Sequence, residues 1–293
     1  MRRSKYSFCK MLQLVKELLK ENPILTSKKI GRPKSYDDVF IISLWLFQTL
    51  HKFSYREILE YVSLEGYSVP ALSTYHYRVQ KLPKEVLQEL IEKVGEIFFR
   101  RDGKRWKGLV VDGTGFGYRE KYVLGWLRGT AAKEVASHVR AVLLVGIDEK
   151  KRIIPLSCEV DFAYASEVEM LRRLLSRVDK LFRLPFIGDK GFDAVDILER
   201  VRGLGCELAI KMKETWRVGI KHPLRKESKV GWERWGKEMR YLIEGVFGNI
   251  KLKLGSKFAL IREDLALKRA LAVFALYALN LIFFNLLYCL FLK

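Results

Sequence analysis

The spacing of apolar residues changes from a helical period to a strand-like pattern along the chain. The first hundred residues carry apolar side chains at helical spacing, in segments 5–21, 39–50, 54–65, 71–80 and 82–99. From residue 108 onwards the apolar residues instead form short, continuous runs, which are typical of strands buried on both faces. We therefore expect an all-helical region at residues 1–103 and a mixed α/β region at residues 104–293.

The helical region contains the pattern of a helix-turn-helix. Ser54-Tyr-Arg-Glu57 is a capping box that starts one helix, Gly66 ends it, and Pro70 starts the next. The second helix, at residues 70–81, carries polar residues on one face and is the candidate recognition helix for DNA. An ordinary helical hairpin would show the same pattern.

The apolar runs of the second region predict a specific order of elements. They lie at residues 109–111, 139–147, 153–160, 184–188 and 208–210, with helical patterns at 166–181 and 194–201. Three strands followed by helix, strand, helix and strand is the layout of an RNase H-like fold, a mixed sheet flanked by helices. In that fold the first and fourth strands are neighbours.

An acidic residue follows each of these two strands. Asp112 comes after the first strand and Asp189 after the fourth, so their carboxylates are expected at the same edge of the sheet. Two adjacent carboxylates repel each other unless a cation lies between them, and Mg²⁺ is a hard ion suited to such ligands. Either acid taken alone could equally be a turn residue.

A third carboxylate comes from a later helix. Arg240, Glu244 and Lys251 lie within about 40° of one another around a helix. The carboxylate could therefore bind metal while the two cations bind phosphate. Gly245 and Gly248 would permit close packing of this helix. The alternative is a simple Arg–Glu pair on a solvated face.

The charge of the chain favours a polyanionic partner. Its 54 Lys and Arg against 34 Asp and Glu give a formal charge of +20, which indicates nucleic acid. Residues 211–237 form a predicted loop with nine basic residues and Trp216, Trp232 and Trp235, and we expect it to touch DNA. The alternative is that the tryptophans anchor the loop on the core. Arg32, in a Gly-Arg-Pro segment, belongs either to a minor-groove arm or to a solvated linker.

These motifs together resemble insertion-sequence transposases of the Asp-Asp-Glu type, in the group with a Tyr-Arg-Glu-Lys signature. The resemblance rests on Val110-Val-Asp-Gly-Thr-Gly115, Gly188-Asp-Lys-Gly-Phe-Asp193 and the spacing of Arg240, Glu244 and Lys251. It departs from the signature at Lys237, which stands where the family has Tyr. Most of the chain takes part in the resemblance.

The resemblance implies a metal-dependent DNA transposase that binds the ends of an insertion sequence, cleaves them and transfers the strands to target DNA. Asp112, Asp189 and Glu244 would be the catalytic residues and the ligands of two Mg²⁺ ions, with Mn²⁺ as a substitute. A homodimer on DNA is expected because two ends are cut together. DNA contacts are expected from Arg240, Lys251, Lys237, Lys190, Trp216, Trp232, Trp235 and Arg32. The alternatives are an RNase H-like nuclease without strand transfer and a non-catalytic, transposase-derived DNA-binding protein.

The remaining features concern the environment of the protein. The four cysteines are far apart and the N-terminus lacks the pattern of a signal peptide, so we expect reduced thiols and a cytoplasmic location. Scarce Asn and Gln beside 30% charged residues suggest a thermophilic source. The apolar segment 270–292 has the length of a membrane span, but we expect a helix buried against the sheet and no membrane.

Overall fold

A computed structural model describes residues 7–26, 34–102, 106–124, 133–178, 183–214, 221–260 and 262–290. The chain forms two compact units, residues 1–94 with 271–293, and residues 95–270. Two helices continue from one unit into the other, α6 (Lys84–Asp102) and α11 (Glu263–Leu290). The units therefore differ from the expected regions 1–103 and 104–293, because the end of α11 groups with the N-terminal helices.

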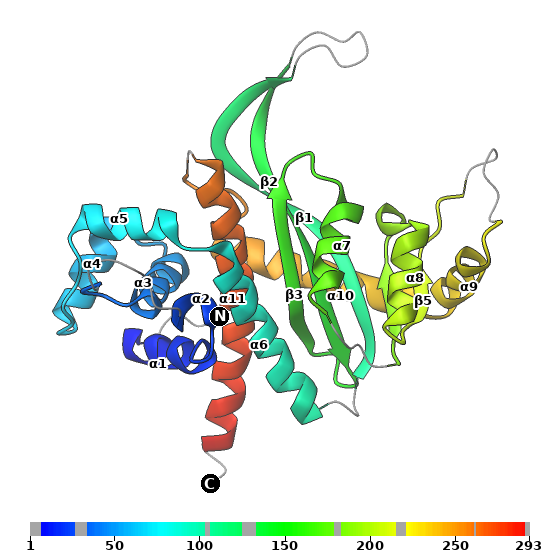
Figure 1. Cartoon of the computed structure of the whole chain (residues 1–293), viewed down its shortest axis with the longest axis horizontal. Coiled ribbons are helices and arrows are strands. Elements are labelled where there is room, and N and C mark those ends of the chain that lie inside the picture. The colour runs from blue at the N-terminus through cyan, green and yellow to red at the C-terminus, as the bar shows by residue number, and fades with distance from the viewer. Residues whose placement is uncertain are drawn as a thin grey trace. The chain divides into compact units, whose positions relative to one another are not determined.

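The described part of the first unit is helical. Besides the shared helices it contains α1 (Phe8–Leu18), α2 (Pro23–Thr26), α3 (Asp38–His51), α4 (Tyr55–Leu64) and α5 (Leu72–Lys81) (Figure 1). The side chains of α3 from Ile41 to Leu50 are all buried, which makes it the central helix of the unit. The capping box at Ser54 and Glu57 is confirmed.

Helix α5 is oriented by its buried side. Tyr75 and Val79 are fully buried, and the hydroxyl of Tyr75 donates a hydrogen bond of 2.8 Å to Gln48 on α3. The opposite side of α5 exposes a group of mostly polar side chains, namely Ser73, Thr74, His76 and Tyr77. The predicted helix, turn and helix are therefore present. The predicted polar face is exposed except at Arg78, which we expected there and whose side chain is only 13% exposed.

An ion pair attaches α5 to the start of α3. Arg78 donates to the Asp38 carboxylate at 2.7 Å, and Lys34 reaches the same carboxylate at 2.5 Å. Burial by itself would raise the pKa of Asp38, but the hydrogen bonds from Lys34 and Arg78 outweigh it and hold the pKa below its ordinary value. This stabilisation is present above the ordinary Asp pKa of about 3.9 and is lost as the pH falls through the lowered value.

Replacing Arg78 with leucine should therefore destabilise the first unit at pH 7, by about 1–3 kcal/mol. The partly buried Asp38 would lose the guanidinium, which is the more buried of the two cations that pair with it. Thermal and urea unfolding followed by circular dichroism measure the effect, with Lys81→Gln on the same helix as the control. An Arg78→Leu variant as stable as the control at pH 7, or a difference that persists below the Asp38 pKa, would contradict this account.

The second unit is built on a five-stranded sheet in the order β3-β2-β1-β4-β5. The strands are β1 (Trp106–Leu124), β2 (Lys133–Asp148), β3 (Ile153–Phe162), β4 (Pro185–Gly188) and β5 (Glu207–Ile210). The pairs β1–β2 and β2–β3 are antiparallel, whereas β4 is parallel to β1 and β5 is parallel to β4. This strand order confirms the RNase H-like fold and the predicted pairing of the first and fourth strands.

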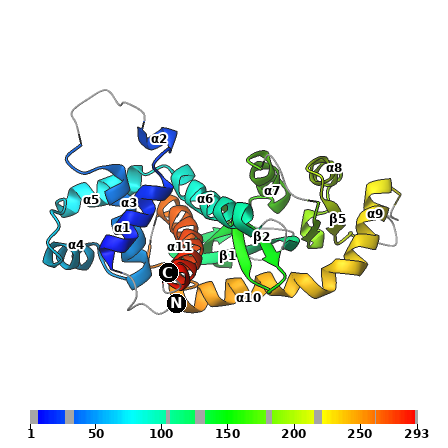
Figure 2. The same cartoon turned by 90° about the horizontal axis from the view of Figure 1, so that it is seen from below.

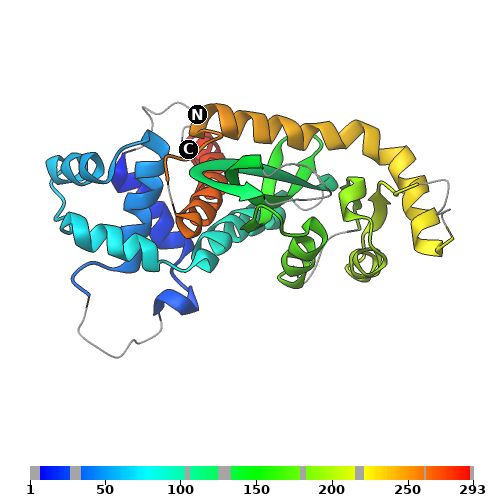
Figure 3. The ribbon, with the colours of Figure 1, turned by 90° about the horizontal axis from the view of Figure 1, so that it is seen from above.

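Helices cover both faces of this sheet. One face packs on α7 (Glu167–Ser176) and α8 (Val195–Gly203), and Leu109 and Val111 of β1 belong to the buried cluster between them. The other face is covered by α10 (Lys237–Leu254), and the two sides are seen in Figures 2 and 3. The layers arise because alternate residues of a buried strand point to opposite faces.

Strand β1 is longer than its apolar run predicts. We expected Asp112 to lie at the exit of the strand, but the antiparallel pairing with β2 continues to Leu124. Asp112 instead marks the end of the parallel pairing, because the last residue of β1 paired with β4 is Val111. Further along, the backbone of Gly117 bonds to Ser256 and Phe258, which follow α10. Between these two points the edge of β1 has no strand beside it among the described residues.

Residues 211–237 are only partly the loop that we predicted. Residues 223–231 form helix α9 (Pro223–Gly231), and Trp232–Gly236 forms a π-helical turn that runs directly into α10. The side chain of Ser228 on α9 both donates to and accepts from the backbone of Ile210, at 2.8 Å each. Helix α9 thus covers the edge of β5, which is a common protection of an edge strand.

The C-terminal apolar segment forms most of α11. Residues Glu263–Phe283 are long and apolar enough to cross a membrane by length and composition, and 67% of their most apolar window is buried in the protein. From Leu271 to Leu279 most side chains are fully buried. From Leu271 onwards the helix groups with the helices of the first unit. We expected this segment to be buried against the sheet, but the sheet belongs to the second unit.

Candidate active site

The two aspartates lie next to each other at the end of the β1–β4 ladder. Val111 pairs with Gly188, so the next residues are Asp112 and Asp189. Both lie on the face of the sheet that carries Val110 and Ile187, because the side-chain direction alternates along each strand. The predicted neighbourhood of the two carboxylates is therefore a consequence of the strand register.

Helix α10 lies along β1 on that same face. Near its start the Met239 sulfur packs against Gly108, where a Cβ atom would lie only 2.9 Å from it. Near its end the Lys251 ammonium lies 5.7 Å from the centre of the Phe116 ring. The helix therefore runs in the same direction as β1 (Figure 3), and Glu244 lies between these contacts.

Arg240 links two of the three carboxylates. Its Nη2 atom lies 3.6 Å from Oδ2 of Asp189 and 3.5 Å from Oε1 of Glu244. Its Nε atom is buried and has no hydrogen-bond partner in the part of the chain that the structure describes. The Arg240–Glu244 pair of the alternative interpretation is present, but the guanidinium also reaches across to Asp189 at the end of β4. Glu244 itself is 57% exposed at its side chain, so the cluster is open on one side.

Asp112 has an elevated pKa. Burial is the main cause, and the negative charges of Asp189 and Glu244 add to it. A hydrogen bond of 2.8 Å from the Gly113 amide and the positive charge of Arg240 oppose the rise without cancelling it. The ionised form of Asp112 is therefore electrostatically unfavourable in this environment, and a nearby divalent cation would stabilise it.

The chemistry of these donors fits a hard divalent ion, but their present arrangement is built around Arg240. Carboxylate oxygens are the ligands that Mg²⁺ prefers in proteins. Among the described residues no group of three or more His, Cys, Asp or Glu side chains is close enough to hold a metal ion. The cation between Asp189 and Glu244 in this structure is the Arg240 guanidinium. Metal binding would therefore require this side chain to move.

Glu167 is a fourth acidic residue at this edge that sequence reasoning missed. A Cβ atom on Gly113 would lie 2.5 Å from its Oε1, and one on Gly191 would lie 2.9 Å from its Oε2. Its Oε1 also lies 3.8 Å from Nη1 of Arg140. The carboxylate therefore occupies space left open by Gly113, directly after Asp112, and by Gly191, two residues after Asp189. An acid in the first turn of the helix that follows the third strand was the available signal.

The glycines on α10 do not have the packing role that we expected. A Cβ atom on Gly245 or Gly248 would meet nothing within 4 Å. The core side of α10 is instead formed by Ile243, Val246, Phe247 and Ile250, which are buried. The helix is held by these apolar residues.

The predicted DNA-binding residues divide into three groups. Lys251 lies on the α10 stripe with Arg240 and Glu244, while Lys190, Lys237 and Trp232 line a nearby pocket. Trp235 does not line this pocket. Its Nε1 donates a hydrogen bond of 3.1 Å to Glu207, which fits the alternative that the tryptophans anchor this segment on the core. Trp216 and Arg32 lie outside the described residues.

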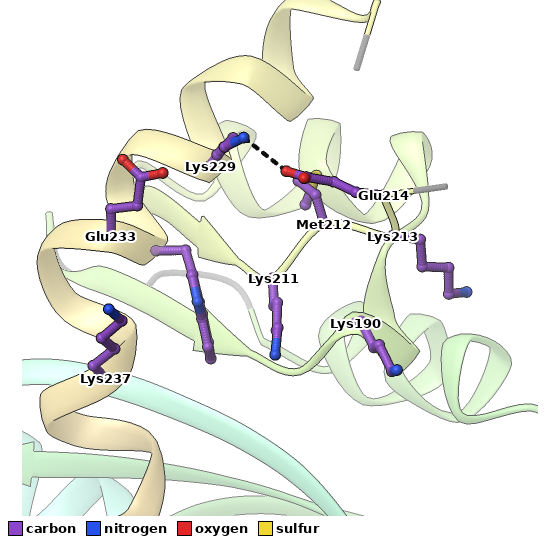
Figure 4. Close-up of a pocket in the computed structure, with 9 residues that line it drawn as sticks. Lys190, Lys211, Met212, Lys213, Glu214, Lys229, Glu233 and Lys237 are labelled. Atoms are coloured by element: carbon purple, nitrogen blue, oxygen red, sulfur yellow. Dashed lines mark ion pairs between the residues drawn. The ribbon is translucent and has the colours of Figure 1, made fainter. Parts of the chain in front are cut away.

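The pocket has a volume of about 820 Å³. It is an open pocket bordered by the segment after β5, the start of α10 and the π-helical turn (Figure 4). Its lining residues are Lys190, Lys211, Met212, Lys213, Glu214, Lys229, Trp232, Glu233 and Lys237. Five lysines against two glutamates make it a basic pocket beside the aspartate at the end of β4.

Comparisons with known proteins give one clear relative. No known protein family profile matches the chain. An uncharacterized protein of Aquifex aeolicus (strain VF5) is 32% identical over 267 residues, which cover 89% of this chain and 83% of that protein.

Two solved structures show weak overall likeness. A piggyBac transposase synaptic complex with hairpin DNA has 10% identity and a TM-score of 0.43, over 95% of this chain and 75% of that chain. The Mos1 strand transfer complex has 12% identity and a TM-score of 0.27, over 88% of this chain and 79% of that chain. The fold assignment rests on the strand order of the sheet and not on these low scores.

Proposed function

The chain belongs to the same protein family as the Aquifex aeolicus protein, and we propose that it is a DNA transposase of the Asp-Asp-Glu type. It would bind the ends of an insertion sequence, cleave the DNA in a metal-dependent reaction and join the freed ends to target DNA. The observation that carries the proposal is the convergence of Asp112, Asp189 and Glu244 on one edge of an RNase H-like sheet, with Arg240 between them.

The positions of the basic residues support a phosphodiester as the substrate. Arg240 and Lys251 lie on the same stripe of α10 as Glu244, and Lys237 continues that stripe one turn earlier. A row of cations beside a group of carboxylates suits a substrate with regularly spaced negative charges, such as the phosphate backbone of DNA. A DNA strand laid along α10 would meet these residues in succession.

The chain's own residues can perform the supporting steps of the reaction. Two Mg²⁺ ions held by Asp112, Asp189 and Glu244 would supply an activated water or 3′-hydroxyl and stabilise the leaving oxygen. Arg240 and Lys251 would orient the phosphate between them, and charge-assisted hydrogen bonds from Arg240 would hold it bidentately. Glu167, held against the glycines that follow the two aspartates, would fix the backbone that carries them.

The first unit offers a surface for recognising the DNA ends. Helix α5 exposes Ser73, Thr74, His76 and Tyr77, while its buried side is fixed on α3. A helix held rigidly with polar side chains outward is the element that enters a major groove in helix-turn-helix proteins. We propose that α5 reads the ends, and that the active protein is a cytoplasmic homodimer that brings two ends together.

A strand-transfer assay tests the proposed function. DNA fragments that carry the terminal inverted repeats flanking the gene are incubated with purified protein, Mg²⁺ and a supercoiled plasmid. A transposase yields fragments joined to the plasmid. Cleavage without joining would identify the RNase H-like nuclease, and binding without cleavage would identify a DNA-binding protein without catalytic activity. Either of the last two results overturns the proposal.

Arg240 should compete with the metal ion in the absence of DNA. Since its guanidinium lies between Asp189 and Glu244, Arg240→Gln should raise the affinity for Mn²⁺ several-fold while it weakens the binding of DNA. Mn²⁺ binding is measured by electron paramagnetic resonance at low ionic strength. Lys253→Gln removes the same charge from an exposed position on the same helix and serves as the control. An unchanged or lower Mn²⁺ affinity in Arg240→Gln would show that the guanidinium does not occupy the metal position.

A further inference from the structure

The pocket beside Asp189 contains an excess of positive charge that the protein leaves uncompensated. Lys229 pairs with Glu214 at 2.8 Å. Within the described ranges none of the other four lysines that line the pocket has a carboxylate within ion-pair distance; they are Lys190, Lys211, Lys213 and Lys237. Five lysines against Glu214 and Glu233 leave the lining with a net charge of +3, which favours an anion with more than one charge.

The wall of this pocket includes a fixed aromatic ring. The indole of Trp232 covers Gly236, where any Cβ atom would overlap the ring. Its ring centre lies 5.8 Å from the Lys211 ammonium. Trp232 begins the π-helical turn, an irregularity that is frequent at functional sites. A ring held in this way beside a cation is suited to stack on a planar group that carries a phosphate.

The lysine segment that forms the floor of the pocket is also fixed. The buried carboxylate of Asp193 accepts hydrogen bonds from the Lys213 amide at 2.8 Å and from Nε of Arg225 at 2.9 Å. Asp193 thereby ties the segment after β5 to the first turn of α9. The pocket is consequently a preformed feature of the second unit.

The pocket lies at one end of the cationic row on α10. Lys190 follows Asp189 directly, and Lys237 lies about 10 Å before Glu244 along the helix, as far as Lys251 lies after it. A strand that passes Arg240 and leaves on the Lys237 side would enter the pocket. A cavity of about 820 Å³ has the size of a small-molecule site, which suits one or two nucleotides and excludes a duplex.

We propose that this pocket binds unpaired nucleotides of the DNA strand next to the phosphate that is cut, with a base stacked on Trp232 and the adjoining phosphates held by the free lysines. The substrate of the active site would then be a strand that is already single-stranded on the Lys237 side of the cut. The location relative to the cut rests on the proposed function, whereas the binding of unpaired nucleotides can be tested by itself.

The test measures DNA binding by the full chain in EDTA. Fluorescence anisotropy compares a blunt duplex with the same duplex carrying a short single-stranded tail at its 5′ or 3′ end. Stacking of one base contributes about 1–3 kcal/mol, so one of the tailed duplexes should bind about tenfold more tightly than the blunt one. Trp232→Leu and Lys211→Gln should each remove most of this preference and leave the affinity for blunt duplex within about twofold.

Matched controls separate the pocket from general effects. Trp235→Leu changes the neighbouring tryptophan, which does not line the pocket, and Lys150→Gln removes one charge in the β2–β3 turn. Both should keep the preference. A 2-aminopurine base in the tail should change its emission on binding to the parent protein and not on binding to Trp232→Leu. If Trp232→Leu does not fold, Lys211→Gln still decides the outcome.

Three results would overturn this inference. They are equal affinity for tailed and blunt duplexes, a preference that survives in Trp232→Leu and Lys211→Gln, and binding of free ATP without any preference for a tail. Because the assay contains no metal, its failure is distinct from failure of the proposed function. A tail preference without any DNA cleavage would support the binding of unpaired nucleotides in the pocket and contradict the transposase function. Cleavage without a tail preference would support the transposase function and contradict the role of the pocket.

Discussion

Replacing Asp112, Asp189 or Glu244 with alanine is expected to lower DNA cleavage at element ends by at least ~10³-fold, which is the range for losing an essential catalytic group. Each substitution removes one of the carboxylates that converge at the end of the β1–β4 ladder. Because the three are proposed to act on the same phosphate, a double variant should be no worse than a single one. Cleavage of a labelled end fragment in Mg²⁺ measures the effect.

Binding of the ends should survive these substitutions. The proposed reading helix α5 belongs to the first unit, whereas the carboxylates belong to the second. Glu238→Ala is the matched control, because Glu238 is an exposed acid on the same helix, about 160° around from Arg240. It should leave cleavage within about twofold. Full cleavage by any one of the three alanine variants would remove that residue from the site.

Gly231→Ala is expected to destabilise the second unit by about 3 kcal/mol or more, because it overpacks a rigid contact. Gly231 ends α9 against β5, and a Cβ atom there would overlap the Leu208 carbonyl oxygen and lie 3.0 Å from its carbon. That atom belongs to the backbone of a buried strand, so no side-chain rotation can relieve the clash. Both α9 and the π-helical turn that carries Trp232 would have to shift.

The matched control is Gly248→Ala, in the interior of α10. A Cβ atom there meets nothing within 4 Å, so the change should stabilise the helix by roughly 0.5–1 kcal/mol. Urea unfolding of the two variants and the parent measures the difference. A Gly231→Ala variant as stable as the parent would mean that α9 does not lie against β5 as described. Loss of the tail preference in Gly231→Ala would follow from the same displacement.

The neighbourhood of the two aspartates was predictable because it depends on strand order alone. Once the fourth strand pairs beside the first in parallel, the acids that end their apolar runs must meet at one edge. Glu244 was predictable from its spacing to Arg240 and Lys251, since that spacing fixes one helical face. The ion pair from Arg240 to Asp189 depends on tertiary packing and could not be derived from spacing.

Other features depend on contacts that local patterns do not encode. The extension of β1 beyond Asp112 runs through Gly113, Gly115 and Gly117, and glycine has low strand propensity, so the pattern favoured a turn there. The strand persists because β2 pairs with it residue by residue. The sequence predicts a loop at the π-helical turn for a related reason, since its two tryptophans and Gly236 give no clear helical pattern. The contacts of Trp232 over Gly236 and of Gly231 on β5 hold it in place.

Glu167 illustrates a third limit. In the sequence it is an acid at the start of a helix, which is a common stabilising position. Its relevance arises only because Gly113 and Gly191 come from other elements and leave room for its carboxylate. Tertiary structure was needed to connect these three residues.

We expect Asp112, Asp189 and Glu244 to hold divalent metal at one edge of the sheet, and iron-directed cleavage of the polypeptide would locate the bound ion. Fe²⁺ replaces Mg²⁺, and ascorbate with peroxide produces hydroxyl radicals that cut the backbone beside the bound ion. Cuts are expected near residues 112, 189 and 244 in the presence of end DNA, suppressed by excess Mg²⁺ and absent in a variant with Asn, Asn and Gln at the three positions. Cuts elsewhere, or the same cuts in that variant, would contradict this expectation.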